Sequence, residues 1–282
     1  MPKIEEKWIF PISMTTPEQT KENIVPKIIW MYWEGSLPEF VQKCVDNIKK
    51  NNPNYVVNFL TPNNVKEFCD IDYGRLKHAT PQQKADLIRF ELIYQHGGIW
   101  LDASTIVYEN LDWIERLVTQ HQTNSFAYYR KKNTTCPDFP VLENWLLASS
   151  AKNMFFKSWF EELIKAIELT PKVYIQQIKE NNENYQDYFQ EIGRLEYLVA
   201  YVACQKIMRT TLPSMTLINC DRNAFFYQVK NKWMKEKVLI DLALNYPPVE
   251  KPKLIKLAGK ERGILSRYYS KKMYFNDSFI DI

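Results

Sequence analysis

The stretch KADLIRFELIYQHGGIWLDAST, Lys84 to Thr105, decides the fold of this 282-residue chain. The whole chain contains only seven glycines, and two of them, Gly97 and Gly98, are adjacent here. They separate a helix-like run from a short apolar run that ends in a single carboxylate, Asp102. A backbone reversal, a buried strand and a carboxylate at its end predict a site at the edge of a parallel sheet, where α/β folds bind nucleotides and metal ions.

The residues around this stretch predict alternating strands and helices. We expect strands at Lys27 to Trp33, Asn54 to Leu60 and Ile99 to Leu101, with Ile106 to Tyr108 resuming the last. Helices are expected at Pro38 to Lys50 and Thr80 to His96, with a short helix at Pro62 to Cys69. The second helix has a capping box of Thr80 and Gln83, with Pro81 at its first position. Strands alternating with helices predict an α/β fold with a mostly parallel sheet and crossover helices.

The second half of the chain is expected to be more helical. Helices are predicted at Leu142 to Ser149, Phe155 to Leu169 and Tyr185 to Arg209, and an apolar run, Met215 to Asn219, precedes Asp221. The chain shows no internal repeat and no Pro/Gly/Ser-rich linker. We therefore predict a loose N-terminal arm over 1–23, one domain over 24–260 and a basic, aromatic tail over 261–282.

Charge and cysteine content narrow the class of protein. The net charge of +4 is too small to indicate a nucleic-acid-binding protein. The segment from Lys251 to Lys272 contains eight basic residues and a single acidic residue, Glu261. Two interpretations of this segment stay open: a solvated tail, or a patch that contacts anionic lipid or diphosphate groups. Five scattered cysteines, no signal-peptide profile and no apolar run of about 18 residues favour a cytoplasmic protein, peripheral at most to the inner face of a membrane.

Several common catalytic motifs are missing. The sequence has neither a Gly-x-Gly-x-x-Gly nor a P-loop pattern, and its three histidines disfavour a histidine-based metal cluster. The literal Asp-x-Asp, Asp70-Ile71-Asp72, has no apolar strand before it and Tyr73-Gly74 after it, which is typical of a turn or a helix cap. No strong nucleophile stands out.

The opening stretch offers another set of candidates. Asp86 and Arg89 are three residues apart and share one helix face. They form either an exposed ion pair or a pair aimed at sugar hydroxyls and phosphate oxygens. Asp102 follows the third strand, and Ser104 points to the same side if the chain stays extended. Such oxygen ligands suit Mg²⁺ or Mn²⁺.

At these residues the chain resembles a known family. The stretch from Lys84 to Thr105 is similar to the signature of the capsular polysaccharide synthesis proteins and of the related glycosyltransferase family 32. Upstream VPKIIWMYWEG resembles their first strand, LENWLLASSAKNMFFKSW their asparagine-containing helix, and KPKLIKL matches more weakly. The resemblance covers roughly residues 24 to 260. It implies a GT-A fold, a nucleotide-sugar donor, a divalent cation and a retaining transfer to a saccharide or lipid-linked acceptor.

The resemblance also assigns roles to residues by position. It implies that 24–125 binds the nucleotide sugar and that 126–260 binds the acceptor. Donor-binding residues are then Trp33, Asp86, Arg89, Gly98, Asp102, Ser104 and Lys256, with Trp33 stacking on the base. Asp102 and Ser104 hold the metal ion, Mn²⁺ or Mg²⁺. Asp102, Arg89 and Asn144 are the catalytic candidates, with Glu143 and Asp187 in reserve, and either Lys253 or Lys256 closes over the diphosphate.

One departure from the family pattern keeps a second function class open. Family 32 usually carries a second acid where this chain has Ser104, although the capsular branch tolerates the Asp-Ala-Ser form. The leading hypothesis is a glycosyltransferase that builds a surface polysaccharide or glycan. The alternative is a nucleotide-sugar- or carbohydrate-binding protein that kept the fold and lost turnover. A phosphodiesterase-like hydrolase and a purely structural protein are both disfavoured.

Overall fold

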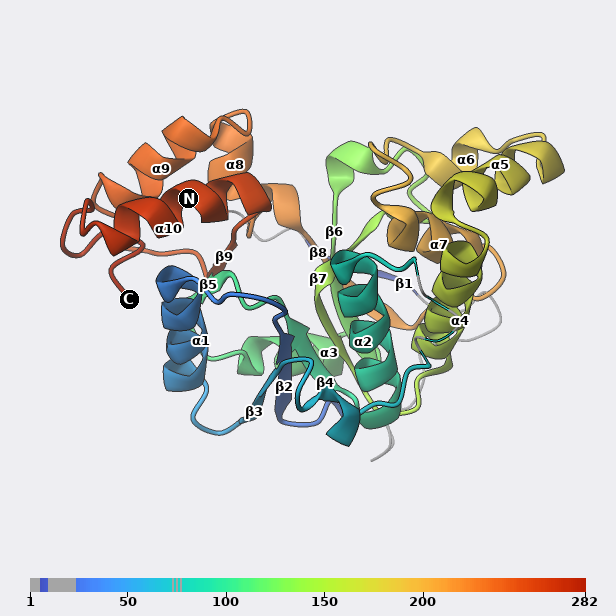
Figure 1. Ribbon diagram of the computed structural model, residues 1–282, viewed down its shortest axis with the longest axis horizontal. Helices are drawn as coiled ribbons and strands as arrows, with labels where there is room; N and C mark the ends of the chain where they lie inside the picture. The colour runs from blue at the N-terminus through green and yellow to red at the C-terminus, as the bar shows by residue number, and fades with distance from the viewer. Residues whose placement is uncertain (1–5, 10–23, 73, 75, 77) are drawn as a thin grey trace.

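A seven-stranded sheet forms the centre of the protein (Figure 1). The computed structural model describes residues 6–9, 24–72, 74, 76 and 78–282. In spatial order the strands are β1 (Glu6–Ile9), β8 (Met215–Asn219), β6 (Ser125–Tyr129), β7 (Leu142–Ser149), β4 (Gly98–Leu101), β2 (Ile28–Tyr32) and β3 (Val56–Leu60).

The strands run mostly in one direction. β2 is parallel to β3 and β4, and β6 is parallel to β8, whereas β7 is antiparallel to both β4 and β6, and β1 is antiparallel to β8. Five of the seven strands therefore point the same way. The predicted α/β fold with a mostly parallel central sheet is confirmed.

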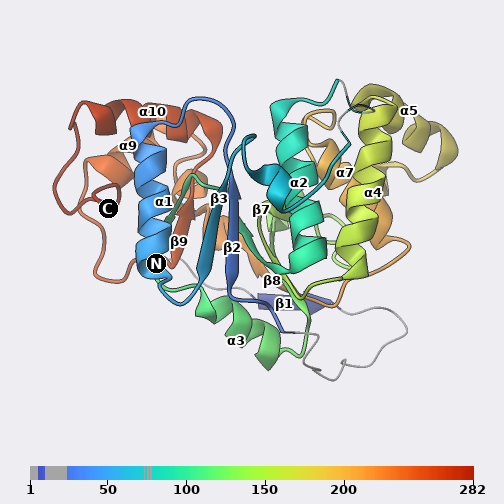
Figure 2. The same cartoon turned by 60° about the horizontal axis from the view of Figure 1, so that its bottom comes forward.

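Helices cover both faces of this sheet (Figure 2). On one face, α2 (Pro81–His96), α4 (Met154–Glu168) and α7 (Val199–Met208) enclose a core that includes Trp30 and Trp100. On the other, α1 (Glu39–Asn51) and α3 (Asp112–Gln120) pack over Ile29, Met31 and Ile99. Neighbouring strand residues thus point into opposite cores, as the alternation of side chains along a strand requires. Both faces of the central strands are buried for this reason.

The remaining elements are short or peripheral. They are α5 (Pro171–Asn181), α6 (Gln186–Phe189), α8 (Phe226–Lys230), α9 (Lys235–Ala243), α10 (Gly259–Ser270), the 3₁₀ turns Val65–Glu67, Lys131–Asn133 and Cys220–Arg222, and the two strands β5 (Thr105–Val107) and β9 (Leu254–Lys256). β5 and β9 form a separate antiparallel pair. The segment after Asp102 is therefore a strand, but it does not resume β4 as we expected.

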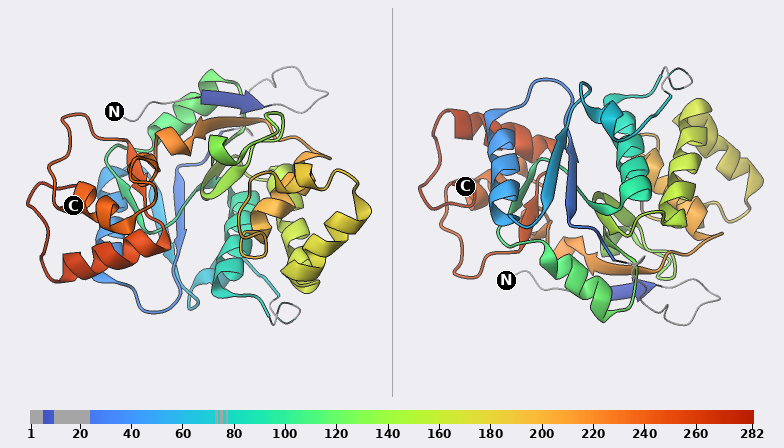
Figure 3. Two further views of the ribbon diagram at one scale, coloured as in Figure 1. Left: turned by 90° about the horizontal axis from the view of Figure 1, so that it is seen from above. Right: turned by 90° about the horizontal axis from the view of Figure 1, so that it is seen from below.

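The C-terminal segment is packed rather than solvated. α9 and α10 lie beside α1, with the C-terminus on the same side of the molecule (Figure 3). Tyr269, Phe279 and Ile280 are buried in a third apolar cluster together with Phe40 of α1. The solvated-tail interpretation of the segment from Lys251 to Lys272 is wrong, because an amphipathic segment with this many aromatic residues gains free energy by covering apolar surface. Contact with a membrane stays a prediction.

Two helix predictions in the second half were wrong. Leu142–Ser149 is the strand β7, and each of its residues is buried. A short apolar run has the same appearance in a buried strand as in a buried helix. The helix predicted over Tyr185 to Arg209 is divided into α6 and α7, because Gln190 and Arg194 adopt positive φ angles of 44° and 52°. Of the predicted N-terminal arm, Glu6–Ile9 forms β1, and the rest lies outside the described residues.

The helix and reversal that define the opening stretch form as predicted. Thr80 and Gln83 make both hydrogen bonds of the capping box, and Pro81 is the first residue of α2. Gly97 and Gly98 have φ angles of +66° and +89°. A Cβ on Gly98 would lie 2.6 Å from the carbonyl oxygen of Ile28 in β2. The strand pairing of β2 with β4 therefore requires glycine at this position.

Gly98→Ala is expected to lower the free energy of unfolding by at least about 2 kcal/mol, because the methyl group meets backbone and the positive φ angle disfavours any side chain. The matched control is Gly263→Ala in α10, where a Cβ meets no atom within 4 Å. That exposed helical position is expected to gain up to about 1 kcal/mol. Urea denaturation of the two variants measures both changes, and equal effects would contradict the role given to Gly98.

Candidate active site

The carboxyl ends of the sheet strands bring the candidate residues to one edge. Trp33 directly follows β2, Asp102 follows β4 and Arg130 follows β6. β7 runs the other way and starts at this edge, which places Asn144 there as well. The backbone N–H of Asp102 donates to the carbonyl oxygen of Trp145 at 2.9 Å, and this bond fixes the end of β4 against the start of β7. Ligand sites of open α/β sheets lie at such an edge.

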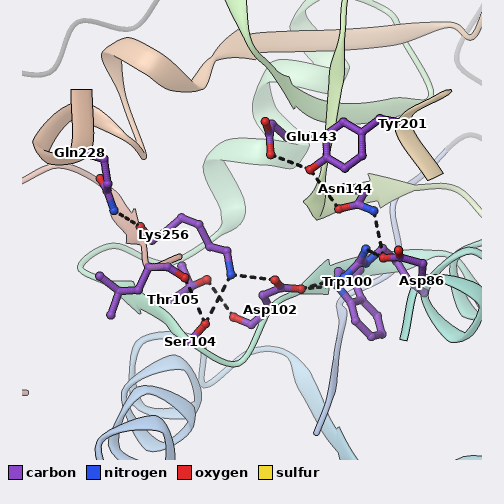
Figure 4. Close-up of polar contacts among 12 residues, drawn as sticks. Asp86, Trp100, Asp102, Ser104, Thr105, Glu143, Asn144, Tyr201, Gln228 and Lys256 are labelled. Carbon is purple, nitrogen blue, oxygen red and sulfur yellow. Dashed lines mark hydrogen bonds and ion pairs between the residues drawn. The ribbon is translucent and has the colours of Figure 1, made fainter. Parts of the chain in front are cut away.

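Asp102 is held from two sides by cations. Figure 4 shows it between Lys256 and Trp100. Its Oδ1 accepts hydrogen bonds from Arg89 at 2.9 Å and from the indole N–H of Trp100 at 3.1 Å. Its Oδ2 accepts from Nζ of Lys256 at 2.7 Å. Burial alone would raise the pKa of Asp102, but Lys256 and Arg89 outweigh it and lower this pKa to about 2. The carboxylate is therefore ionised at neutral pH while 28% of its side chain stays exposed.

Arg89 joins Asp102 to α2. Its guanidinium lies 4.8 Å from the centre of the Trp100 ring and also pairs with Asp86. The side chains of Arg89 and Asp86 are only 6% and 7% exposed. The interpretation of these residues as an exposed helical ion pair is therefore wrong. They form a buried pair directed at the sheet edge, where loss of one partner leaves a buried charge unpaired.

Asp86 continues the network to β7. Its Oδ1 accepts a hydrogen bond from Nδ2 of Asn144 at 3.0 Å. Burial raises the pKa of Asp86 to about 6, although Arg89 acts in the opposite direction. The hydroxyl of Tyr201 donates to Glu143 Oε2 at 2.9 Å and lies 3.4 Å from Asn144 Oδ1. Asn144 is thus on a strand rather than the expected helix, and both of its amide atoms have partners.

Tyr201 is a site residue that the sequence did not indicate. It lies within the apolar run of α7, and no local pattern distinguishes it from the core residues around it. Only the packing of α7 against β7 brings its hydroxyl to Glu143. Burial raises the pKa of the Glu143 carboxyl, which was a reserve candidate. The other reserve candidate, Asp187, is exposed on α6.

Two predicted donor-binding residues have no contact with this network. Gly98 lies against the backbone of β2, as described above. Trp33 is half-buried, its indole N–H donates to the carbonyl oxygen of Ser36 at 3.1 Å, and the guanidinium of Arg262 lies 5.1 Å from its ring centre. Arg262, from α10, is a second residue that the sequence did not single out for the site. The roles of Gly98 and Trp33 in donor binding stay predictions.

The predicted metal ligands do not fit a divalent cation. Nζ of Lys256 lies 2.7 Å from Asp102 Oδ2 and 3.4 Å from Ser104 Oγ, so one ammonium group contacts both predicted ligands. Ser104 is buried, and its hydroxyl lies 3.5 Å from the carbonyl oxygen of Leu257. Within the described part of the chain, no three His, Cys, Asp or Glu residues gather as a metal site. A cation bound here would have to displace Lys256.

The literal Asp-x-Asp motif lies in a stretch of the described residues without regular secondary structure. Asp70 and Asp72 are both exposed, and Asp72 Oδ1 accepts a hydrogen bond from the backbone N–H of Gly74 at 2.8 Å. Lys253, the other lysine considered for the diphosphate, pairs instead with Glu109. Neither feature takes part in the Asp102 network.

A cavity of about 240 Å³ adjoins the network. Its lining includes Arg130, Glu143, Tyr201, Phe225 and Trp233. The Arg130 guanidinium donates to Asp221 at 2.9 Å and lies 5.0 Å from the centre of the Trp233 ring. Aromatic faces, a cation and a buried carboxyl group are therefore presented to one cavity. Glu143 and Tyr201 connect it to Asn144.

The sequence itself matches a known family over most of its length. Residues 2–239 match the model of the capsular polysaccharide synthesis protein family. The chain belongs to this family. The match confirms the resemblance noted in the opening stretch, and it ends before β9, so Lys256 lies outside the matched residues.

Curated relatives of this family member are distant and longer. Glycosyltransferase afumC of Aspergillus fumigatus is 26% identical over 150 residues, which are 47% of this chain and 38% of the relative. O-glycosyltransferase braB of Annulohypoxylon truncatum is 25% identical over 166 residues, 51% of this chain and 38% of the relative. The chain thus aligns with under half the length of these proteins.

Solved structures give a weaker likeness. The apo-form glycosyltransferase GlyE of Streptococcus pneumoniae TIGR4 aligns with 89% of this chain and 65% of its own, at 11% identity and a TM-score of 0.43. The PaToxG glycosyltransferase aligns at 12% identity over 88% of this chain and 87% of its own, with a TM-score of 0.39. Among the described residues, no helix combines the length and apolarity needed to cross a bilayer.

Replacement of Asp86 by asparagine is expected to change how stability depends on pH. The folded-state pKa of about 6 lies above the ordinary value of 3.8, so Asp86 contributes stability below pH 4 that is lost as the pH rises through 6. The asparagine variant lacks this loss. Its unfolding free energy relative to wild type should therefore increase by up to about 3 kcal/mol between pH 4 and 7. Urea titrations at each pH measure the difference; a constant or falling difference contradicts the assignment.

Proposed function

We propose that this protein is a glycosyltransferase that moves a sugar from a nucleotide-sugar donor to a saccharide or lipid-linked saccharide acceptor. The observation that carries the proposal is the partly buried Asp102 held between Arg89 and Lys256 at the sheet edge. Membership of the capsular polysaccharide synthesis family supports it, as do the names of the curated relatives. A cationic edge of this kind suits the diphosphate of a nucleotide sugar.

The donor is proposed to lie across the ends of β2 and β4. Trp33 offers a half-buried ring for the base, with Arg262 beside it. Asp102 and the cations around it face the diphosphate. Asp86 is proposed to hold the Arg89 guanidinium in place, and Asn144 to lie on the side of the sheet edge that faces the donor sugar. Asp86 contacts both Arg89 and Asn144.

The acceptor is proposed to occupy the cavity beside Glu143. Trp233 and Phe225 provide aromatic faces of the kind that pack against the C–H faces of sugars, and Arg130 and Glu143 provide polar groups for hydroxyls. Glu143 and Asn144 are neighbours on β7. An acceptor in this cavity therefore lies next to the donor site, because both sites use residues at the start of β7.

We propose that the transfer retains configuration. Both oxygens of Asp102 accept hydrogen bonds from cations, which makes this carboxylate a poor nucleophile. Attack by the acceptor hydroxyl on the same face as the departing diphosphate fits this better than a covalent intermediate on Asp102. The acceptor proton then passes to the leaving diphosphate, and Asn144 orients the sugar.

A nucleotide-sugar-binding protein without turnover is the second candidate. The observation that favours it is Ser104, whose hydroxyl is buried at the position where family 32 usually has an acid. Such a protein binds donor but releases no free sugar and forms no glycoside. Turnover by the purified protein separates the two functions.

A screen of nucleotide sugars, with and without Mn²⁺, tests the proposed function. We expect at least one donor to be hydrolysed or transferred, and Asp102→Asn to lower turnover at least about 100-fold, because the replacement releases two cations from their shared partner. Asp70→Asn is the matched control, since this aspartate belongs to the exposed Asp-x-Asp motif. Binding without turnover supports the second candidate, and neither binding nor turnover rejects both.

Trp233→Ala tests the acceptor cavity. We expect it to raise KM for the acceptor found in the screen by about 10-fold or more, through loss of a stacking surface, while donor hydrolysis stays unchanged. The control is Tyr246→Ala, since Tyr246 is 72% exposed and lies outside the cavity lining. Steady-state kinetics at varied acceptor concentration measure the effect. An unchanged acceptor KM contradicts the assignment.

A further inference from the structure

We infer that Lys256 supplies, at the donor diphosphate, the positive charge that a divalent cation was expected to supply, so that this chain binds its donor without a metal ion. The inference rests on the proposed function and names the group that meets the diphosphate.

The position of the ammonium group carries this inference. Lys256 Nζ contacts Asp102 Oδ2 at 2.7 Å and Ser104 Oγ at 3.4 Å, and these two side chains are the metal ligands expected from the sequence (Figure 4). A Mg²⁺ ion that took both side chains as ligands would lie about 2.1 Å from each of these two oxygens. The ammonium group already contacts the same two oxygens, so such an ion would overlap it and be repelled by its charge. The lysine and a divalent ion therefore compete for one place.

The fold holds Lys256 in this place independently of its charge. Lys256 is paired with Thr105 in the antiparallel β5–β9 ladder. Its backbone N–H donates to the carbonyl oxygen of Ala224 at 3.2 Å, and its carbonyl oxygen accepts a hydrogen bond from Gln228 at 2.5 Å. The Thr105 hydroxyl donates to the carbonyl oxygen of Asp102 at 2.8 Å. Hydrogen bonds thus connect β9 both to the segment that follows Asp102 and to Gln228. The side chain of Lys256 is only 9% exposed. A charge fixed in this way needs little reorganisation when the diphosphate binds.

The charges around the ammonium suit a diphosphate. Arg89 and Lys256 flank Asp102. Burial lowers the pKa of Lys256 and the nearby Arg262 lowers it further, whereas Asp102 raises it. An ammonium group has three hydrogens. Asp102 and Ser104 account for two of them among the described residues, so one remains for a phosphate oxygen. Asp102 then positions the cation, as it would a metal ion.

The transfer step balances with an ammonium group in this role. The bond between the anomeric carbon and the diphosphate oxygen breaks, and its electron pair stays on the diphosphate. The acceptor hydroxyl oxygen forms the new bond to the anomeric carbon, and its proton passes to the diphosphate. Lys256 keeps its proton throughout and donates a hydrogen bond to the oxygen on which negative charge develops.

Titration calorimetry of the wild-type protein with UDP, GDP and CDP tests the inference. Each titration is made in EDTA and again in Mn²⁺, and Mn²⁺ alone is also titrated into the protein. We expect one nucleoside diphosphate to bind with the same affinity in both buffers, and Mn²⁺ alone not to bind. At least a 10-fold loss of affinity or of donor turnover in EDTA, restored by Mn²⁺, overturns the role of Lys256.

Variants at Lys256 give a second, independent measurement. Lys256→Met is expected to weaken binding of that nucleoside diphosphate by about 10- to 100-fold, the usual effect of one charge-assisted hydrogen bond, and Lys256→Arg to restore most of it. The matched control is Lys230→Met, which removes a Lys–Asp ion pair of similar length, 2.9 Å to Asp241, on an exposed surface. The melting temperature of each variant shows whether it is folded.

The outcomes separate this inference from the proposed function. If no nucleoside diphosphate binds in either buffer and no nucleotide sugar is turned over, the proposed function fails. If binding or turnover occurs only with Mn²⁺, the proposed function stands and the role of Lys256 fails. If a folded Lys256→Met variant binds as tightly as wild type in EDTA, the role of Lys256 also fails. Because the wild-type measurement needs no substitution, the test remains decisive even if Lys256→Met does not fold.

Discussion

The ionic contact of Asp102 with Arg89 and Lys256 is the interaction on which the site depends. It connects the end of β4 with α2 on one side and with β9 on the other, and Lys256 is 154 residues further along the chain. All three side chains are largely withdrawn from water, so each charge would be left without compensation if its partner were removed. The position of the β5–β9 pair over the sheet edge is consequently part of the site itself. The apolar packing of α9 and α10 on α1 supports that position from behind.

The network has a direction along the sheet edge. On the side of β2, Trp33 and Arg262 present a ring and a cation; in the centre, Asp102 lies between two cations; on the side of β7, Asn144 and Glu143 lead to an aromatic cavity. A donor followed by an acceptor fits this order. Because Asp86 contacts both Arg89 and Asn144, the proposed donor and acceptor sides share one set of hydrogen bonds.

The sequence predicted the first half of the fold better than the second. Between Lys27 and Leu101, periodicity, a capping box and two glycines agree, and the strands and the two long helices form where expected, whereas the short helix expected at Pro62 to Cys69 is only the 3₁₀ turn Val65–Glu67. In the second half, β7 is buried on both faces and carries no alternation that could distinguish it from a helix. The segment between Tyr185 and Arg209 has apolar residues throughout, but two positive φ angles interrupt it. Local patterns fail where tertiary packing sets the backbone.

The sequence by itself determined the α/β fold, the place of the site after β4, and the candidates Asp86, Arg89 and Asp102, because these residues lie within one short stretch whose local geometry is nearly self-contained. Only the tertiary structure decided what surrounds Asp102. It brought Lys256 onto the expected metal ligands, Asn144 onto a strand and Tyr201 to Glu143. Contacts between residues so distant in sequence depend on how the sheet edge, α7 and β9 pack together, and no local pattern encodes that packing.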